Sequence, residues 1–287
     1  MPGVESPVVN LTLLEWLPLL AALAGAGVVA GILAGLLGVG GGIVIVPALD
    51  FALTAVGVSP AVALHIAVAT SMATIIPTAA ASARGHAREG SVDFEVIRRW
   101  SVPIALGALA GALLASRVQG RTLALVFAVI ALLAAVRMLL PFKGRTLRRS
   151  IPGGLVGATL PAAIGGISAM MGIGGGTLSV PSLTLCGLPV HRAVGTASLL
   201  GLLIAIPGTV GYLFAQAPVG LAPALTVGYV SLPGFAVVSP LSWLAAPLGV
   251  RLAHRLDRRT LSAGFGLFLL IVAGRMIFRV LSTHAGG

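Results

Sequence analysis

The stretch Gly35-Leu-Leu-Gly-Val-Gly-Gly-Gly-Ile-Val-Ile-Val-Pro47 decides the fold of this chain. A similar stretch, Gly166-Ile-Ser-Ala-Met-Met-Gly-Ile-Gly-Gly-Gly-Thr-Leu-Ser-Val-Pro181, follows later. In both, an apolar segment runs into three consecutive glycines and continues as a short apolar run toward a proline. Glycine has the most backbone freedom to lose, so three in a row disfavour a continuous helix. We therefore predict that a helix is interrupted twice, once at each glycine triplet.

The composition indicates a polytopic membrane protein. Of the 287 residues, 57% are hydrophobic and 9% are charged, and the mean hydropathy is +1.09. Soluble domains carry about 25% charged residues. The formal net charge is +11, and the basic residues lie mostly in short loops. We interpret them as signals of membrane orientation and as contacts for lipid headgroups, not as a nucleic-acid binding surface. The single cysteine, Cys186, excludes an internal disulfide and a cysteine-based metal cluster.

Apolar segments divide the chain into two comparable halves. A membrane helix needs about 20 residues. The expected segments are 17–37, 43–56, 61–83, 102–116, 122–140, 151–171, 177–187, 193–214, 221–250 and 261–278. The two that follow the triplets are too short to cross comfortably and indicate half-helices or re-entrant segments. The basic loop 141–150 separates two predicted transmembrane repeats, residues 1–142 and 143–287. The first segment lacks the basic flank of a signal peptide, so we expect it to stay as a membrane helix.

Three landmarks recur in the same order in both halves. Gly38 and Pro47 match Gly172 and Pro181. The pattern His-x-Ala-Val-(Ala/Gly)-Thr spans 65–70 and 191–196, and Arg-Thr-Leu occurs at 121–123 and 259–261. This order indicates an internal duplication.

The distribution of basic residues indicates that the duplicated halves are inverted. The loop at 84–99 is basic, whereas its counterpart at 215–220 is uncharged, and the next pair of loops shows the reverse. Basic loops face the cytoplasm, so equivalent loops should lie on opposite sides. We predict an all-α protein of the cell inner membrane with two inverted repeats of about five helical segments each, and both termini outside.

The glycine triplets are the candidate binding site. The first N–H groups of a half-helix and its positive dipole end favour an anion, and two inverted copies would direct two such ends toward one site at the midplane. The alternative is close helix packing, which we expect for the isolated pairs Gly31/Gly35 and Gly107/Gly111. Because broken helices mark transporter sites, we favour binding for the triplets.

Polar side chains near the repeated histidine motif complete the predicted site. Hydroxyl groups within a helix can hydrogen-bond an oxyanion, and histidine can carry a proton near neutral pH. The alternative is a helix start near the interface whose hydroxyls bond the preceding turn. For the histidines we favour a position at a helix start near the interface. For the hydroxyl groups, which lie deeper in their segments, we favour a position lining the binding site. The predicted substrate-binding residues are Gly40, Gly41, Gly42, Thr70, Ser71, Gly174, Gly175, Gly176, Thr196 and Ser198. The candidates for proton coupling or gating are His65, His191 and Arg192.

At these residues the chain resembles the TauE/SafE family of sulfite and organosulfonate permeases, also called the 4-toluene sulfonate uptake permease family. The resemblance covers nearly the whole chain. It rests on both glycine motifs with their prolines, on Ala67-Val-Ala-Thr-Ser71 and on Ala193-Val-Gly-Thr-Ala-Ser198. The family often has Thr-Ser after Ala-Val-x, whereas the second copy here reads Thr-Ala-Ser. The resemblance implies a permease for sulfite, a sulfonate, or a related small sulfur or carboxylate anion.

The leading hypothesis is a secondary transporter for such an anion, with alternating access about the paired breaks and protons as a candidate coupling ion. An anion channel or a passive assembly partner is one alternative. An intramembrane serine hydrolase is another, with Ser168 as nucleophile and His191 as base, although the glycine after Ala169 that would complete a Gly-x-Ser-Gly pattern is missing. We predict no cofactor and no metal site, because no acidic residue or cysteine lies near His65 or His191 in the sequence.

Overall fold

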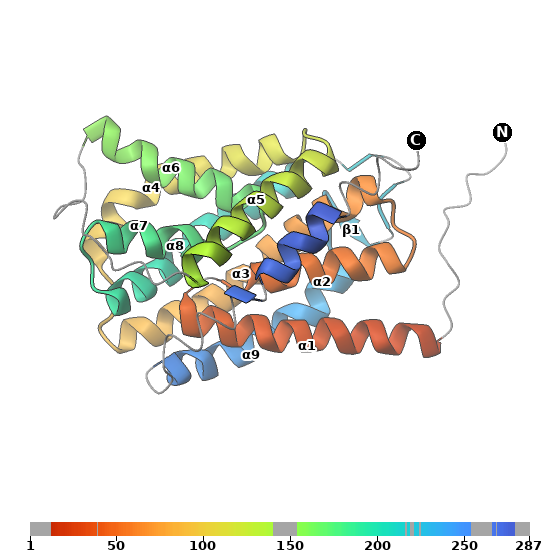
Figure 1. Ribbon diagram of the computed structural model, residues 1–287, viewed down its shortest axis with the longest axis horizontal. Coiled ribbons are helices and arrows are strands. Elements are labelled where there is room, and N and C mark those ends of the chain that lie inside the picture. The colour runs from red at the N-terminus through yellow and green to blue at the C-terminus, as the bar shows by residue number, and fades with distance from the viewer. Residues whose placement is uncertain are drawn as a thin grey trace.

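Helices make up nearly all of the described chain. The computed structural model describes residues 13–38, 40–139, 154–215, 217–218, 221–223, 225–253, 266–267 and 269–278 (Figure 1). Its elements are α1 (Leu13–Leu37), α2 (Gly42–Ala55), α3 (Pro60–Arg88), α4 (Phe94–Ala115), α5 (Gly120–Leu139), α6 (Gly154–Met170), α7 (Gly176–Leu185), α8 (Val190–Phe214), β1 (Thr226–Val227), β2 (Val230–Ser231) and α9 (Leu232–Ala253). A last helical stretch covers Leu269–Phe278. Five helices of the described residues are long and apolar enough to cross a membrane, which confirms the predicted all-α membrane architecture.

Both predicted interruptions are present. Helix α1 ends at Leu37, and the chain turns through Gly38, Gly40 and Gly41 at φ values of +66°, +77° and +74° before α2 begins. Side chains other than glycine rarely adopt this left-handed region. The second break lies between α6 and α7 and turns at Gly172, whose φ is +64°. The short elements after the breaks are helices.

The helices pack in pairs that correspond between the two halves. Helix α1 lies along α9, and α6 lies along α4; Figure 1 shows α1 and α9 side by side. Helices α3 and α8 contact each other, α3 also packs on α9, and α8 packs on α4. The short helix α2 rests on α3, and α7 rests on α8. These matched contacts fit a two-fold relation between the halves. The inverted orientation stays a prediction, and the predicted boundary at 142/143 lies outside the described residues.

Small residues bring two of these helix pairs into close contact. A Cβ atom added to Gly31 or Gly35 would collide with the backbone of α9, at the carbonyl oxygens of Ser242 and Ala246. On α4, a Cβ atom at Gly107 or Gly111 would collide with the backbone of α6. The prediction that the isolated glycine pairs serve helix packing is confirmed.

The boundaries of α3 and α4 differ from the expected ones. The predicted loop at 84–99 is mostly helical, because α3 continues to Arg88 and α4 already begins at Phe94. Asp93 caps α4 by accepting hydrogen bonds from the N–H groups of Glu95 and Val96, at 3.1 and 3.2 Å. A good cap and charged surface residues let a helix extend beyond the apolar segment.

The apolar segment expected at 221–250 is not one helix. Its first part forms the antiparallel hairpin of β1 and β2, and α9 starts only at Leu232. Gly228 turns this hairpin at a φ of +58°. Hydropathy alone does not separate such an apolar hairpin from the start of a helix.

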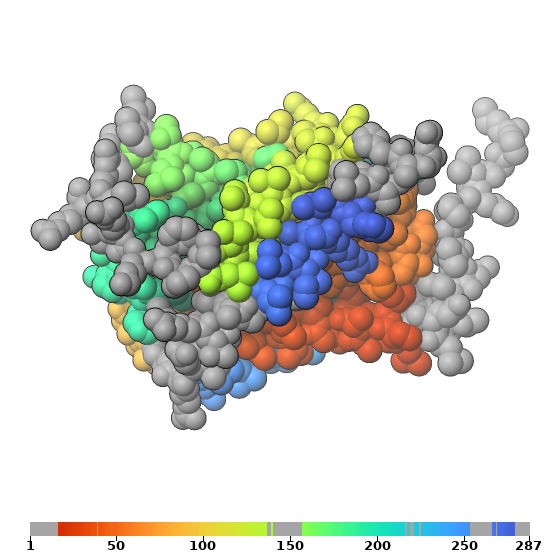
Figure 2. All heavy atoms as spheres, viewed as in Figure 1, coloured from red at the N-terminus to blue at the C-terminus, as the bar shows by residue number. Residues whose placement is uncertain are grey.

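The outer surface is rich in apolar side chains. Figure 2 shows α5 beside the last helical stretch on one face. A Cβ atom on Gly266, which precedes that stretch, would lie 2.9 Å from the side chain of Leu139 at the end of α5. Large exposed apolar side chains on α4 and α5 include Val102, Leu106, Val129 and Leu133. An apolar outer face is what a protein surrounded by lipid requires.

Candidate functional site at the contact between the helix breaks

The two helix breaks meet inside the protein. A Cβ atom added to Gly40 would lie 2.9 Å from the Cα atom of Gly174. A Cβ atom on Gly42 would collide with the carbonyl oxygen of Gly172. The glycines of both triplets are buried. The structure therefore brings Gly40 of the first triplet against Gly174 of the second, and Gly42 against Gly172, through contacts made largely by backbone atoms.

Both half-helices begin at this contact. Helix α2 starts at Gly42 and α7 starts at Gly176. The first N–H groups of a helix have no acceptor within that helix, and the helix start carries a partial positive charge. Two positive helix ends thus lie near each other, which suits an anion.

The two serines of the predicted site lie beside the breaks. Ser71 on α3 donates a hydrogen bond to the carbonyl oxygen of Gly172 at 2.7 Å, and so ties α3 to the second break. Ser198 on α8 donates to the carbonyl oxygen of Val194 at 3.1 Å. Its Oγ would lie 3.1 Å from a Cβ atom on Gly38, in the first break. Each serine thus contacts the break of the opposite half.

The two threonines of the predicted site make equivalent backbone contacts. Thr70 Oγ1 accepts a hydrogen bond from the N–H of Ser231, and Thr196 Oγ1 accepts one from the N–H of Asp93, both at 2.9 Å. Both threonines are fully buried. Each therefore holds the residue that precedes α9 or α4. Their part in anion binding stays a prediction, to which the structure adds this positioning contact.

The candidate proton-coupling or gating residues lie in different surroundings. His65 is 4% exposed, so it packs inside the protein, with Nε2 2.9 Å from the carbonyl oxygen of Val118. Its ring lies 5.4 Å from that of Tyr229 in the hairpin. His191 and Arg192 are exposed near the start of α8. Arg192 forms an ion pair with Asp93 at 3.0 Å, which links α8 to the start of α4.

A buried polar face on α3 extends beyond the predicted residue Ser71. Its other members, Thr74, Thr78, Ser82 and His86, were missed by the sequence analysis. Thr78 shares a hydrogen bond with Ser242 Oγ at 2.7 Å, and Ser82 shares one with Ser198 Oγ at 3.1 Å. His86 Nε2 lies 2.9 Å from the carbonyl oxygen of Gly35. The spacing of three or four residues was a readable signal, since such residues share one face of a helix.

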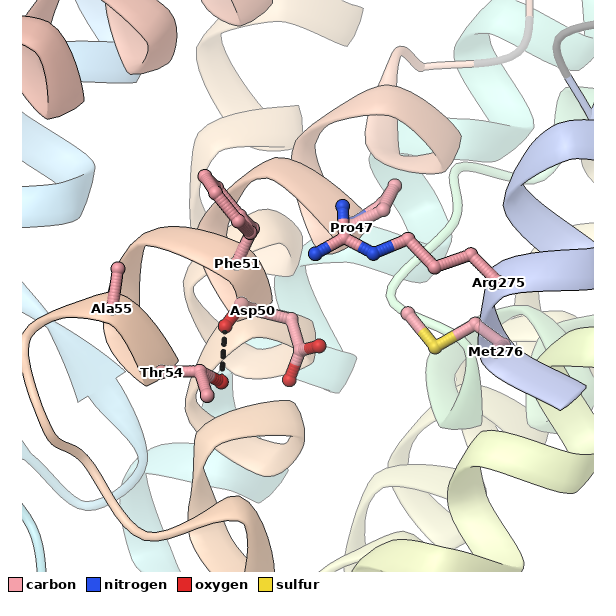
Figure 3. A pocket seen from close by; sticks show the side chains of 7 residues that line it. All are labelled: Pro47, Asp50, Phe51, Thr54, Ala55, Arg275 and Met276. Carbon is pink, nitrogen blue, oxygen red and sulfur yellow. Dashed lines mark hydrogen bonds between the residues drawn. The ribbon is translucent and has the colours of Figure 1, made fainter. Parts of the chain in front are cut away.

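A second missed feature is a cavity beside α2 (Figure 3). It has a volume of about 230 Å³, and its lining residues are Pro47, Asp50, Phe51, Thr54, Ala55, Arg275 and Met276. Asp50 is 5% exposed, and Arg275 projects toward the same space with its Cζ 4.7 Å from the centre of the Phe51 ring. Asp50 is the only acidic residue between Glu15 and Glu89, which was the available signal. Ionisable residues within membrane segments are costly and often functional.

A protein-family profile matches the part of the chain that contains the helix breaks and the residues around them. Residues 23–276 match the profile of the family described as sulfite exporter TauE/SafE. The chain belongs to the TauE/SafE family. The matched span includes both helix breaks, the polar face of α3 and the cavity at Asp50.

Individual TauE/SafE relatives are similar along nearly their full length. A probable membrane transporter protein of Haemophilus influenzae is 33% identical over 260 residues, covering 88% of this chain and 96% of that protein. The probable membrane transporter protein YunE of Bacillus subtilis is 24% identical, covering 88% and 95%. MJ0441 of Methanocaldococcus jannaschii, named in the same way, is 25% identical, covering 90% and 97%. No solved structure matches the chain.

These findings identify a multi-pass membrane transporter of the TauE/SafE family. The hydrolase alternative lacks the contact it needs. A nucleophilic serine requires a base within hydrogen-bond reach. Ser168 is buried in α6, and among the described residues its Oγ has no hydrogen-bond partner, so His191 does not activate it in this structure.

Proposed function

We propose that this TauE/SafE protein is a secondary transporter for a small oxyanion such as sulfite or an organosulfonate. The anion binds at the contact between the two helix breaks and crosses by alternating access. The observation that carries the proposal is the direct approach of Gly40 to Gly174, because it places the positive starts of α2 and α7 at one buried point.

The packing of the half-helices suits alternating access. Helix α2 rests on α3, and α7 rests on α8. The two breaks touch through glycines, so a small shift of one half-helix with its long partner separates them without removing large side chains. The contact between Gly40 and Gly174 is then the closed arrangement of the proposed site.

The polar face of α3 provides a path for the anion between the site and the C-terminal end of this helix. It runs from Ser71, beside the second break, to His86 in the last turn of α3. Arg84 and Arg88 lie at that end and favour an anion in its vicinity. The proposed orientation places this basic end in the cytoplasm of a cell with the protein in its inner membrane, and both termini outside.

Flux measurements in proteoliposomes test the function. Purified protein is expected to carry labelled sulfite or an organosulfonate in a saturable way, and counterflow by unlabelled anion would separate a carrier from a channel. Repeating the assay with and without a pH gradient tests protons as the coupling ion. Absence of protein-dependent flux for every anion tried would refute the proposal.

A substitution in the first glycine triplet tests whether the contact between the helix breaks is the binding site. Gly41→Leu is expected to abolish flux, since Gly41 has a φ of +74° and its Cβ position lies 2.5 Å from the carbonyl oxygen of Ala30. Correct membrane insertion is checked by yield and by size-exclusion profile. A folded Gly41→Leu protein with normal flux would contradict the assigned site.

A further inference from the structure

The starts of the two half-helices differ chemically. In α7 the second and fourth residues are Thr177 and Ser179, whereas the equivalent positions in α2 are Ile43 and Ile45. Both isoleucines are fully buried. The first half-helix therefore offers only backbone N–H groups at its start, while the second adds two hydroxyl groups.

Ser179 is buried, and no described residue forms a hydrogen bond with its hydroxyl group. Its side chain is 0% exposed, and within the described part of the chain its Oγ finds no donor or acceptor. Helical side chains tilt toward the helix start. Accordingly, Ser179 Oγ would lie 3.3 Å from a Cβ atom on Gly175, the residue that caps α7. The hydroxyl is thus directed at the positive end of the helix.

Thr177 shows the same lack of a partner. Its Oγ1 is buried and, among the described residues, makes no hydrogen bond. Farther along α7, Ser182 and Thr184 donate to the carbonyl oxygens of Leu178 and Pro181, at 2.7 and 2.8 Å. Leaving a buried hydroxyl without a partner costs free energy. Among the described residues, the two hydroxyl groups far from the start of α7 are hydrogen-bonded, and the two nearest its start are not.

Small residues face the start of α7. A Cβ atom on Gly201 would lie 3.6 Å from the amide nitrogen of Gly175 and 4.0 Å from the Cβ of Ala79. Helices α8 and α3 thus bring a glycine and an alanine to this point, and Ile204 of α8 also reaches it, with its Cδ1 2.6 Å from the position of a Cβ atom on Gly175.

We infer that the start of α7 is the half of the anion site that determines specificity, and that Thr177 and Ser179 donate hydrogen bonds to a bound oxyanion. This inference rests on the proposed function. The N–H groups of Gly176 and Thr177 bind the same anion. Sulfite and sulfonates offer three acceptor oxygens for these donors, so they bind more tightly than a carboxylate, and a carboxylate more tightly than chloride.

Variants that remove the hydroxyl group of Ser179 or Thr177 test the inference. Binding of sulfite, methanesulfonate, acetate and chloride to purified protein is measured by titration calorimetry for wild type, Ser179→Ala, Thr177→Val and the control Ser182→Ala. Loss of a hydrogen bond to a charged ligand is expected to raise the Kd for sulfite and methanesulfonate about 10- to 100-fold in the first two variants. The control, whose hydroxyl is bonded to backbone, is expected to stay within about twofold, since it keeps every contact to the ligand.

The outcomes separate this inference from the function on which it rests. Removing an unpartnered hydroxyl should not lower the denaturation midpoint, so weak binding by a folded Ser179→Ala protein reports the ligand contact. Wild-type affinity in both Ser179→Ala and Thr177→Val overturns the inference and leaves the transporter function intact. If Ser179→Ala does not fold, the Thr177→Val result decides alone. If wild type neither binds nor carries any of the anions, both the function and the inference are wrong.

Discussion

Gly201→Ala is the most informative single change, because it adds one methyl group beside the start of α7 without disturbing the fold. The added Cβ would lie 3.6 Å from the amide nitrogen of Gly175 and 4.0 Å from the Cβ of Ala79. Both distances are ordinary van der Waals contacts, so no neighbour has to move. We expect the variant to insert and fold like the wild type.

The expected effects on stability and on binding have opposite signs. Alanine is favoured over glycine within a helix by about 1 kcal/mol, so the denaturation midpoint should be equal or higher. An anion bound to the N–H groups of Gly176 and Thr177 competes with the methyl group for the space at the start of α7. Loss of one hydrogen bond to a charged ligand costs about 1.5–3 kcal/mol, which corresponds to a 10- to 100-fold weaker affinity at ~1.4 kcal/mol per factor of ten.

Calorimetry with sulfite and methanesulfonate, together with flux in proteoliposomes, measures the effect. Gly25→Ala on α1 is the matched control, because a Cβ atom there lies more than 4 Å from every neighbour that the structure describes. It adds the same methyl group at a helix position far from the proposed site, and should leave affinity and flux unchanged. A Gly201→Ala protein that keeps wild-type affinity and flux would show that the anion does not approach the start of α7.

Three further changes test the described contacts by thermal denaturation and size-exclusion chromatography in detergent. Thr70→Val leaves the N–H of Ser231 without its acceptor and should destabilise the protein by about 1–3 kcal/mol; an unchanged midpoint would argue against this contact. Gly111→Leu should prevent recovery of folded protein, since even its Cβ collides with the backbone of α6; a monodisperse variant would contradict this helix pairing. Arg192→Ala should change stability by less than about 1 kcal/mol, because the ion pair with Asp93 is partly exposed and screened; a larger loss would mean that the pair closes a buried contact.

The helix breaks could be predicted from the sequence because their cause is local. Three glycines in a row disfavour helix wherever they occur, and the observed φ values at Gly40 and Gly41 lie in the region that favours glycine. The packing of Gly31 and Gly107 could be predicted for a similar reason, since small residues at intervals of four allow backbones to approach. The glycine pattern does not specify which helix each pair contacts.

The ends of α3 and α4 and the hairpin before α9 could not be predicted from hydropathy. Backbone hydrogen bonding, not apolarity, sets where a helix ends, so α3 continues through charged residues to Arg88. The cap at Asp93 was a local signal of the start of α4 that the apolar pattern concealed. The hairpin at Thr226–Ser231 contains no charged residue, so it does not interrupt the apolar segment in the sequence.

For the candidate site, the sequence shows which polar side chains are present. It does not show which of them already form hydrogen bonds within the protein. Thr70 and Thr196 were predicted to line the site, and the structure shows backbone N–H groups bonded to both oxygens. Ser179 was overlooked because α7 carries four hydroxyl side chains, and the sequence does not show which of them are already hydrogen-bonded. Its missing partner is visible only once the surrounding atoms are placed.

The pairing of α1 with α9 has a consequence for how the protein is made. The first helix leaves the ribosome roughly 200 residues before its partner does, which at 5 to 20 residues per second is on the order of 10 to 40 seconds. During that time the glycine-lined surface of α1 around Gly31 and Gly35 faces lipid or an insertion factor instead of α9. A nascent chain truncated before Leu232 should therefore remain bound to the insertion machinery or be degraded, even though every residue of both breaks has already been synthesised.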